Sequence, residues 1–199
     1  MQGQFMGTYY NFTTTQISVA AFVFLVVVGI GLATYVERRK TRTRTLRDRF
    51  GSEYDRAVIA HGSSRRAEAK LDDRQTRVNA FEIRELGLAE RERLVTEWHT
   101  VQARFVDHPK SAVNEADELI NTLLDTRGYP HASFEQRAAD VSVTYPRVME
   151  NYRLAHGIAV RTGRTEATTE ELRTAMIQYR DIFDELAQAQ RPAEAKSAA

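Results

Sequence analysis

The chain has 199 residues, with 28 Lys and Arg against 27 Asp and Glu, and it contains no Cys. Without Cys, disulfides, iron–sulfur clusters, thiol catalysis and zinc sites built from Cys are all excluded. Only four Pro and ten Gly are present, which favours helices over strands and turns. We therefore expect an all-α chain with one ordinary domain and an appendage.

Residues 17–35 form a continuous apolar segment, ISVAAFVFLVVVGIGLATY, and no side chain before residue 37 is charged. As a helix this segment is about 28 Å long, which matches the hydrocarbon thickness of a bilayer. The alternatives are a buried core helix, which usually has a polar face, and a cleaved signal peptide, which has basic residues before its apolar run. The segment has neither feature and predicts a transmembrane helix at residues 17–36.

Seven basic residues follow the apolar segment within residues 37–50, and with two acidic ones they give this stretch a net charge of +5. Since the whole chain carries +1, residues 51–199 carry −4. Basic residues beside a span stay on the cytoplasmic side, so residues 1–16 should be extracytoplasmic and residues 51–188 a cytoplasmic domain. Contact with the lipid bilayer and its anionic headgroups is expected for the basic residues nearest the span: Arg38, Arg39, Lys40, Arg42 and Arg44.

Gly29 and Ala33 are small residues four positions apart in the apolar segment. Such a pair lets two membrane helices approach closely, although it also occurs by chance in apolar helices. A homodimer through Gly29 and Ala33 is therefore one expectation for the span.

The rest of the chain spaces its apolar residues by three and four, which predicts a soluble bundle of successive amphipathic helices. Four capping features are expected: Ser63 or Ser64, Asp107 before an early Pro109, Gly128 at a helix end, and a capping box at residues 168–171. The side chains expected to be buried are Ala67, Leu71, Val78 and Phe81; Leu94, Trp98, Val101 and Phe105; Val113, Ala116, Leu119, Ile120, Leu123 and Leu124; Val148, Tyr152, Leu154 and Ile158; and Leu172, Met176, Tyr179, Phe183 and Leu186.

Two short segments have strand-like composition: FEIREL at residues 81–86 and VSVTY at residues 141–145. We interpret both as extended connections between helices. Residues 189–199 have no large apolar side chain to bury and are predicted to be a disordered tail.

The sequence contains no motif that specifies a reaction. None of its five His forms an H-E-x-x-H pair, and no phosphate-binding glycine loop is present. We therefore predict no metal and no cofactor, and we favour a non-enzymatic role while leaving catalysis open. Nucleic acid is not expected as a partner, because the soluble part is acidic and the basic residues adjoin the span.

Residues 134–156 hold the densest group of polar and aromatic side chains. Arg137 and Asp140 are three apart and are expected to pair on one helix, while Tyr152 and His156 share a helix face. One interpretation is a small pocket for an anionic ligand, and the favoured one is a hydrogen-bond network between helices. The candidate ligand-binding residues are Arg137, Asp140, Tyr152, Arg153 and His156.

Three stretches resemble a widespread group of uncharacterised bacterial proteins: RFGSEYDRAV at residues 49–58, VQARFVDHPKSAVNEADELI at residues 101–120, and residues 134–156. The resemblance implies a bacterial source and a genuine domain, and it implies no activity. Together with the predicted span, a bacterial source indicates a location in the inner membrane. The sequence therefore favours a membrane-anchored adaptor or scaffold domain that binds a protein partner. The alternative is a membrane-tethered domain that senses a small ligand or catalyses a reaction with residues 137–156.

Overall fold

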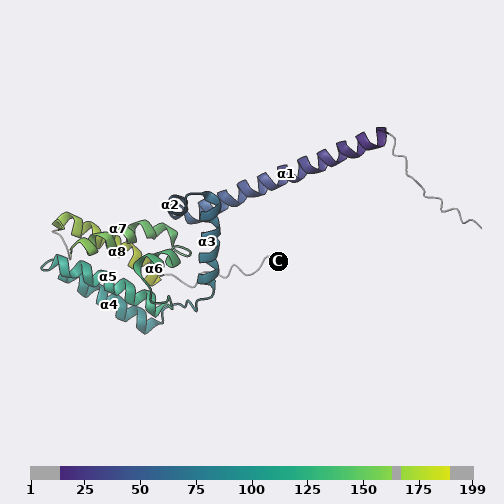
Figure 1. Cartoon of the computed structure of the whole chain (residues 1–199). Helices are drawn as coiled ribbons and strands as arrows, with labels where there is room; N and C mark the ends of the chain where they lie inside the picture. The colour runs from purple at the N-terminus through teal and green to yellow at the C-terminus, as the bar shows by residue number, and fades with distance from the viewer. Residues whose placement is uncertain (1–13, 163–166, 189–199) are drawn as a thin grey trace, which may run out of the picture. The chain divides into compact units, whose positions relative to one another are not determined.

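The computed structural model describes residues 14–162 and 167–188, and in these ranges it contains eight α-helices, one 3₁₀ helix and no strand (Figure 1). The prediction of an all-α chain, with a long apolar N-terminal helix followed by a helical bundle, is confirmed. The predicted tail at 189–199 lies outside the described residues. The chain divides into two compact units, Met1–Thr45 and Leu46–Ala199.

Helix α1 (Thr14–Phe50) continues without a break from the apolar segment through the basic one. No Pro interrupts it, and the hydroxyls of Thr34 and Thr41 donate to carbonyls of the preceding turn, Gly31 O at 2.9 Å and Glu37 O at 3.0 Å. An 18-residue window within Ala21–Phe50 has a mean hydropathy of 1.8, and none of it is buried by protein. By length and composition, α1 is able to cross a membrane.

Gly51 separates α1 from α2 (Ser52–His61), because its φ of 51° is favourable only for Gly. Helix α3 (Ser64–Asn79) follows, and the hydroxyl of Ser63 accepts a hydrogen bond from the Arg66 amide, so the predicted cap is confirmed. Phe50, in the last turn of α1, is 1% exposed. It packs in a small core with residues of α2, α3 and the turn after α6: Tyr54, Ala57, Ala67, Leu71, Val78 and Val143.

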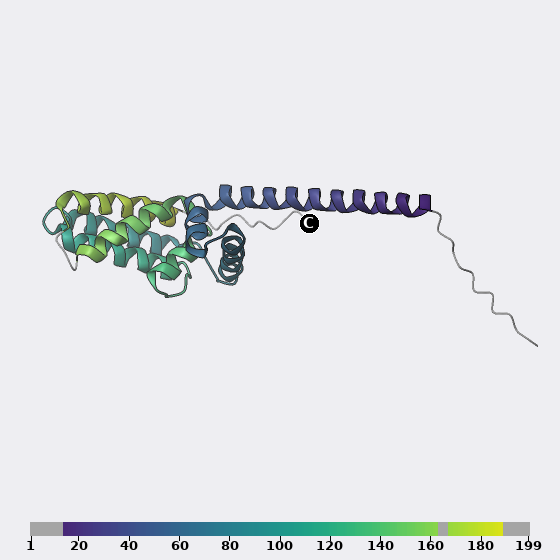
Figure 2. The ribbon, with the colours of Figure 1, turned by 45° about the horizontal axis from the view of Figure 1, so that its top comes forward.

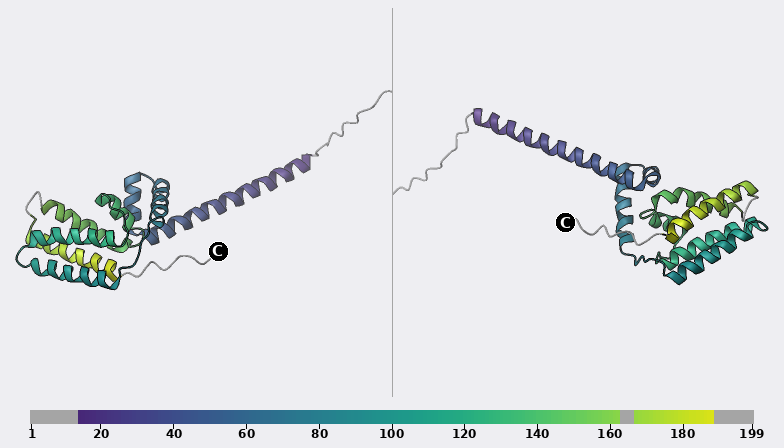
Figure 3. Two further views of the ribbon diagram at one scale, coloured as in Figure 1. Left: turned by 90° about the horizontal axis from the view of Figure 1, so that it is seen from below. Right: turned by 180° about the vertical axis from the view of Figure 1, so that it is seen from behind.

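Four helices run alongside one another as a bundle: α4 (Leu88–Arg104), α5 (Pro109–Thr126), α7 (Met149–Thr162) and α8 (Thr169–Gln188) (Figures 2 and 3). The predicted stripes of α5 and α8 are all buried, and Trp98 of α4 stacks on Phe183 of α8 with ring centroids 4.9 Å apart. The predicted burial of Leu154 is wrong, because it is 48% exposed. Helix α7 turns Tyr152, Ala155 and Ile158 inward, which leaves Leu154 on the opposite side.

The helix ends confirm most of the predicted capping. Thr168 and Glu171 exchange both hydrogen bonds of the capping box before α8, at 2.9 and 3.2 Å. Pro109 is the first residue of α5, but His108 and not Asp107 is the residue that precedes it at the cap. Gly128 ends α5 with a φ of 91°, and a Cβ there would lie 2.5 Å from the carbonyl oxygen of Glu82. Only Gly fits this close approach of two backbone segments.

Helix α6 (Phe134–Val141) and the 3₁₀ helix η1 (Pro146–Val148) connect α5 to α7. Residues 81–86 form a non-helical connection as predicted, and Phe81 and Ile83 pack against both cores. Residues 141–145 differ from the prediction, because Val141 belongs to α6 and residues 142–144 form a turn. Contacts of α6 with α3 and α7 place its polar side chains between these elements.

Candidate functional site

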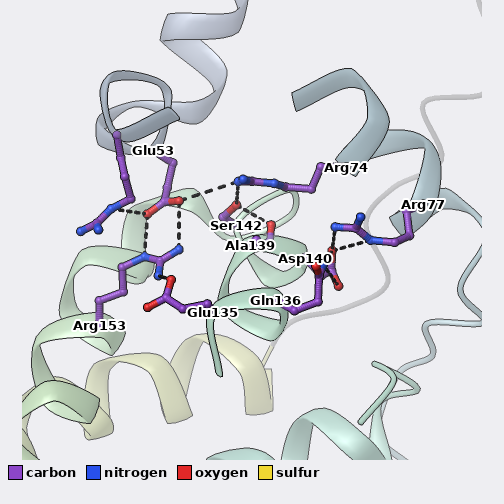
Figure 4. Close-up of polar contacts among 10 residues, drawn as sticks. Glu53, Arg74, Arg77, Glu135, Gln136, Ala139, Asp140, Ser142 and Arg153 are labelled. Carbon is purple, nitrogen blue, oxygen red and sulfur yellow. Dashed lines mark hydrogen bonds and ion pairs between the residues drawn. The ribbon is translucent and has the colours of Figure 1, made fainter. Parts of the chain in front are cut away.

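Glu53 is the centre of a polar cluster between α2, α3, α6 and α7 (Figure 4). It is the second residue of α2 and is 3% exposed. Arg153 of α7, whose side chain is 9% exposed, donates to both of its carboxylate oxygens, from Nε at 3.0 Å and from Nη2 at 3.3 Å. This bidentate contact is the strongest geometry for an ion pair between an arginine and a carboxylate. Arg153 also binds Glu135 at 2.6 Å, although Glu135 is exposed.

Two further arginines approach Glu53. Arg56, one turn along α2, lies 3.6 Å from its carboxylate, and Arg74 of α3 lies 3.9 Å away and donates to the Ser142 hydroxyl at 3.3 Å. Burial lowers the pKa of Arg74, and the charge of Glu53 opposes that shift. Burial is the largest single influence on Arg153 and lowers its pKa, but the hydrogen bonds and charges of Glu53 and Glu135 together outweigh burial and raise the pKa overall. The cluster thus holds its arginines charged by placing them around one buried carboxylate.

Asp140 of α6 belongs to the same region but does not bind Arg137. It accepts hydrogen bonds from Nε of Arg77 at 3.0 Å and from Nη2 of the same side chain. The amide of Gln136, one turn earlier in α6, donates to both Asp140 oxygens at 3.0 and 2.9 Å. The predicted pairing of Asp140 with Arg137 is therefore wrong, since Asp140 faces α3.

Arg137 instead points toward α5 and is 2% exposed. Its guanidinium donates to Asp125 at 2.6 Å and to the side-chain oxygen of Asn121 at 3.0 Å. It also reaches the Pro130 carbonyl at 3.4 Å and Nδ1 of His131 at 3.2 Å. Arg137 thus ties the last two turns of α5 to the connection that follows it.

Tyr152 and His156 lie on the predicted common face of α7, where both meet Phe134 of α6. The rings of Phe134 and His156 stack with centroids 3.6 Å apart, and Tyr152 meets Phe134 edge-on at 5.0 Å. Nδ1 of His156 lies 3.0 Å from Oδ1 of Asp117, which also accepts the Tyr179 hydroxyl at 2.8 Å. Because Asp117 is an acceptor here, it favours the His156 tautomer with its proton on Nδ1.

The tyrosines of this region are held neutral. Burial raises the pKa of Tyr179, and the neighbouring Asp117 raises it further. Burial also raises the pKa of Tyr152, whose hydroxyl has no hydrogen-bond partner among the described residues. These groups therefore join α5, α6, α7 and α8 through hydrogen bonds and ring contacts.

The five candidate residues do not meet at one point. Arg153 and Asp140 take part in the cluster around Glu53 and its neighbours in α3, whereas Arg137 and His156 bind residues of α5. The Tyr152 ring contacts Phe134 of α6 and Tyr179 of α8. Sequence reasoning missed their partners, because these residues are far away along the chain: Glu53 lies 100 residues before Arg153, and Arg77 lies 63 residues before Asp140. The sequence does hold one indication of these partners. Glu53 is followed by Tyr54 and Asp117 is preceded by Ala116, and both of these neighbours are buried in the core.

A cavity of about 830 Å³ lies elsewhere in the second unit, and none of the five candidates lines it. Its walls come from the last turn of α1, the start of α2, α3, the connection before α4, the turn leading into η1, and α8. The lining residues are Asp48, Arg49, Phe50, Gly51, Ser52, Gln75, Val78, Asn79, Phe81, Ile83, Val143, Thr144, Tyr145, Pro146, Arg147, Val148 and Glu185.

The seven basic residues after the apolar segment fall into two groups. Arg47 and Arg49 belong to the second unit, where Arg47 forms an ion pair with Asp55 at 2.7 Å and the guanidinium of Arg49 lies 5.6 Å from the centre of the Phe50 ring. The five residues predicted to meet lipid headgroups are exposed on α1 within the first unit: Arg38, Arg39, Lys40, Arg42 and Arg44.

No family model matches this chain, and neither a curated protein nor a solved structure matches it. Its function is therefore inferred from the helices and side chains themselves. Most polar candidates of residues 134–156 are engaged in contacts between helices, while the cavity is a separate feature that sequence reasoning did not anticipate.

Proposed function

We propose that this protein is a single-pass membrane protein that holds a helical adaptor or scaffold domain at the cytoplasmic face of a bacterial cell membrane. The observation that carries the proposal is α1, whose apolar window is not buried by protein and is followed directly by exposed basic residues. An apolar helix of this length needs either lipid or another protein surface, and a basic flank on one side favours a bilayer with that flank inside.

The interaction role is supported by how the second unit uses its charged side chains. Arg137, Arg153 and Asp140 are largely buried and bind partners on other helices. Such contacts hold the helices in one arrangement and suit a domain that presents a fixed surface to a protein partner. The alternative, a ligand-sensing domain, is favoured by one observation, the cavity of about 830 Å³.

Reporter fusions test the topology. Alkaline phosphatase, which is active only outside the cytoplasm, should be silent when fused after Ala199, and a fluorescent protein fused there should be bright. A matched variant replaces Arg38, Arg39 and Lys40 by Gln and adds three Lys before the span, which should weaken or reverse both signals. Strong phosphatase activity in the wild-type fusion would refute the assigned orientation.

Crosslinking in intact cells tests the adaptor role. The full chain should retain the same protein partner when α1 up to residue 36 is replaced by an unrelated span, because the second unit carries the recognition. The partner should be lost when residues 46–199 are deleted and the span is kept. A partner that follows the span instead would place recognition in the membrane.

Lipid contact is tested with a peptide of residues 37–45, which holds the exposed basic residues. It should bind vesicles containing anionic lipid at about 1 kcal/mol for each basic residue near the surface, and salt should weaken the binding. The control is the same peptide with each Arg and Lys replaced by Gln. Equal binding to neutral vesicles would restrict these charges to a role in orientation.

Dimerisation through Gly29 and Ala33 stays part of the proposal. Both residues are exposed on α1, and among the described residues nothing beyond the adjoining part of α1 itself lies within 4 Å of a Cβ built at Gly29. Gly29→Leu should abolish self-association in a membrane two-hybrid assay if this pair forms the interface. The control Val26→Leu changes a large residue for another, and unchanged association in both variants would exclude the interface.

A further inference from the structure

The cavity has the size and the mixed wall of a small-molecule site. Its volume of about 830 Å³ lies within the usual range for ligand sites. The apolar part of its wall is built from both cores and from the connections between them: Phe50, Val78, Phe81, Ile83, Val143 and Val148. This part offers apolar and aromatic contacts to the body of a ligand.

Two exposed arginines of the wall have no acidic partner in the part of the chain that the structure describes. Arg49 lies in the last turn of α1 and Arg147 in η1, and within residues 14–162 and 167–188 neither pairs with a carboxylate. The guanidinium of Arg49 lies over the Phe50 ring, at 5.6 Å from its centre. The lack of a carboxylate partner distinguishes Arg49 and Arg147 from Arg77, Arg137 and Arg153, which all bind carboxylates. Arg49 and Arg147 are therefore available to an anion that enters the cavity.

A third arginine lies buried behind the wall. Arg127 is 0% exposed, donates from Nη1 to the Leu186 carbonyl at 2.6 Å, and sits 5.6 Å from the centre of the Tyr145 ring. Among the described residues, its Nε and Nη2 have no partner at full hydrogen-bond geometry, although the charge of Arg127 and its polar contact with the Tyr145 hydroxyl oppose the rise in the pKa of Tyr145 that burial causes. A buried guanidinium with no carboxylate partner among the described residues favours negative charge nearby, and Tyr145, the ring that Arg127 contacts, lines the cavity.

Two acidic residues also line the cavity, Asp48 and Glu185. Against the three guanidinium groups they leave a small positive excess, which suits one anionic group and not a polyanion. The ligand therefore needs a single acidic head and a body able to cover apolar side chains.

We propose that this cavity binds an amphipathic anion, with one carboxylate or phosphate at Arg49 and Arg147 and an aliphatic or aromatic body against Phe50, Val78 and Val143. The same chemistry is found in a lipid-derived acid and in a soluble aromatic or aliphatic acid. The site does not depend on the adaptor role or on the orientation of α1, because every residue that forms it belongs to the second unit.

Photoaffinity labelling of the full chain in lipid discs tests the site. The probes are a diazirine-bearing fatty acid, its uncharged methyl ester, and a diazirine-bearing benzoic acid, with the labelled peptides mapped by mass spectrometry. At least one acid should label residues 48–52, 75–83 or 143–148, and the unlabelled acid should compete. Labelling by the fatty acid alone indicates a lipid-derived ligand, and labelling by the benzoic acid indicates a soluble one. Equal labelling of these segments by acid and ester, or acid labelling confined to residues 17–36, would refute the proposal.

Variants separate the anion contact from general lipid association. Arg147→Gln and Arg49→Gln replace exposed side chains and should each raise the half-saturating acid concentration about three- to fivefold. Arg93→Gln, on the exposed face of α4, is the matched control and should change nothing. Val148→Trp should fill part of the cavity and reduce labelling there. Unchanged labelling in both Gln variants, or in Val148→Trp, would overturn the site.

Discussion

The buried pair of Glu53 and Arg153 offers the sharpest test of the polar cluster (Figure 4). Arg153→Met keeps most of the length of the side chain and removes its charge, which leaves Glu53 buried without the two hydrogen bonds at 3.0 and 3.3 Å. Loss of one partner from a buried pair costs about 3–5 kcal/mol. Arg56 and Arg74 stay within 4 Å of Glu53 and reduce this cost, so we expect the free energy of unfolding to fall by about 2–3 kcal/mol.

The measurement is urea unfolding of a fragment of residues 46–188, followed by the fluorescence of Trp98, the only Trp in the chain. Glu135→Gln is the control: Glu135 also binds Arg153, but its side chain is 78% exposed, so its loss should cost less than about 1 kcal/mol. Glu53→Gln should cost about as much as Arg153→Met, and the double variant should be about 1–2 kcal/mol more stable than the sum of the single changes implies. Equal effects of Arg153→Met and Glu135→Gln, or strict additivity in the double variant, would show that the pair does not hold the helices together.

Four further outcomes are expected from the same assay. A fragment that begins at residue 51 lacks Phe50, which is 1% exposed, and should be about 3–5 kcal/mol less stable than one that begins at residue 46; equal stability would mean that the end of α1 is dispensable. Arg137→Ala should cost about 1–3 kcal/mol by removing a buried guanidinium that binds Asp125 and Asn121, and a neutral result would contradict the bracing role. Tyr152→Phe should leave stability unchanged or raise it, because its hydroxyl is buried without a hydrogen-bond partner among the described residues; a clear loss would reveal a missed contact. The hydrogen bond from Arg84 lowers the pKa of Glu90 from 4.5 to about 2, so the stability that wild type holds over Glu90→Gln should be full above pH 4.5 and vanish as the pH falls through about 2, and a pH-independent difference would refute the assignment.

The parts of the fold that depend on nearby residues could be predicted from the sequence. The apolar stripe of α8 has the period of a helix that buries one face, and its five predicted residues are all buried. The cap at Ser63 and the capping box at Thr168 are set within four residues of chain, so their patterns are recognisable in the sequence alone. Leu154 shows the limit of this reasoning, because the orientation of α7 is decided by the helices around it.

The candidate site could be predicted only as a region. Residues 134–156 do contain side chains that join α6 and α7 to the rest of the domain, but local spacing does not indicate the partners on other helices that bind Arg137, Arg153 and His156. Arg137 and Asp140 have the right spacing to pair on one helix, yet Asp125 and Arg77 are better placed. An i,i+3 pair contributes only about 0.2–0.5 kcal/mol, so the contacts of these two buried side chains with partners on other helices decide where they point.

The cavity was not foreseen for the same reason. It is built from residues of α1, α2, α3, η1, α8 and three connecting segments, and no short stretch of sequence contains more than a part of it. What distinguishes Arg49 and Arg147 from Arg77, Arg137 and Arg153 is the lack of an acidic partner among the described residues, a property that depends on the whole fold. Arginines that stabilise the domain are those whose charge is already compensated between helices. Arginines that line a cavity and whose own charge is not compensated are free to bind an anion. Arg49 and Arg147 are therefore better candidates for ligand binding than Arg137 or Arg153.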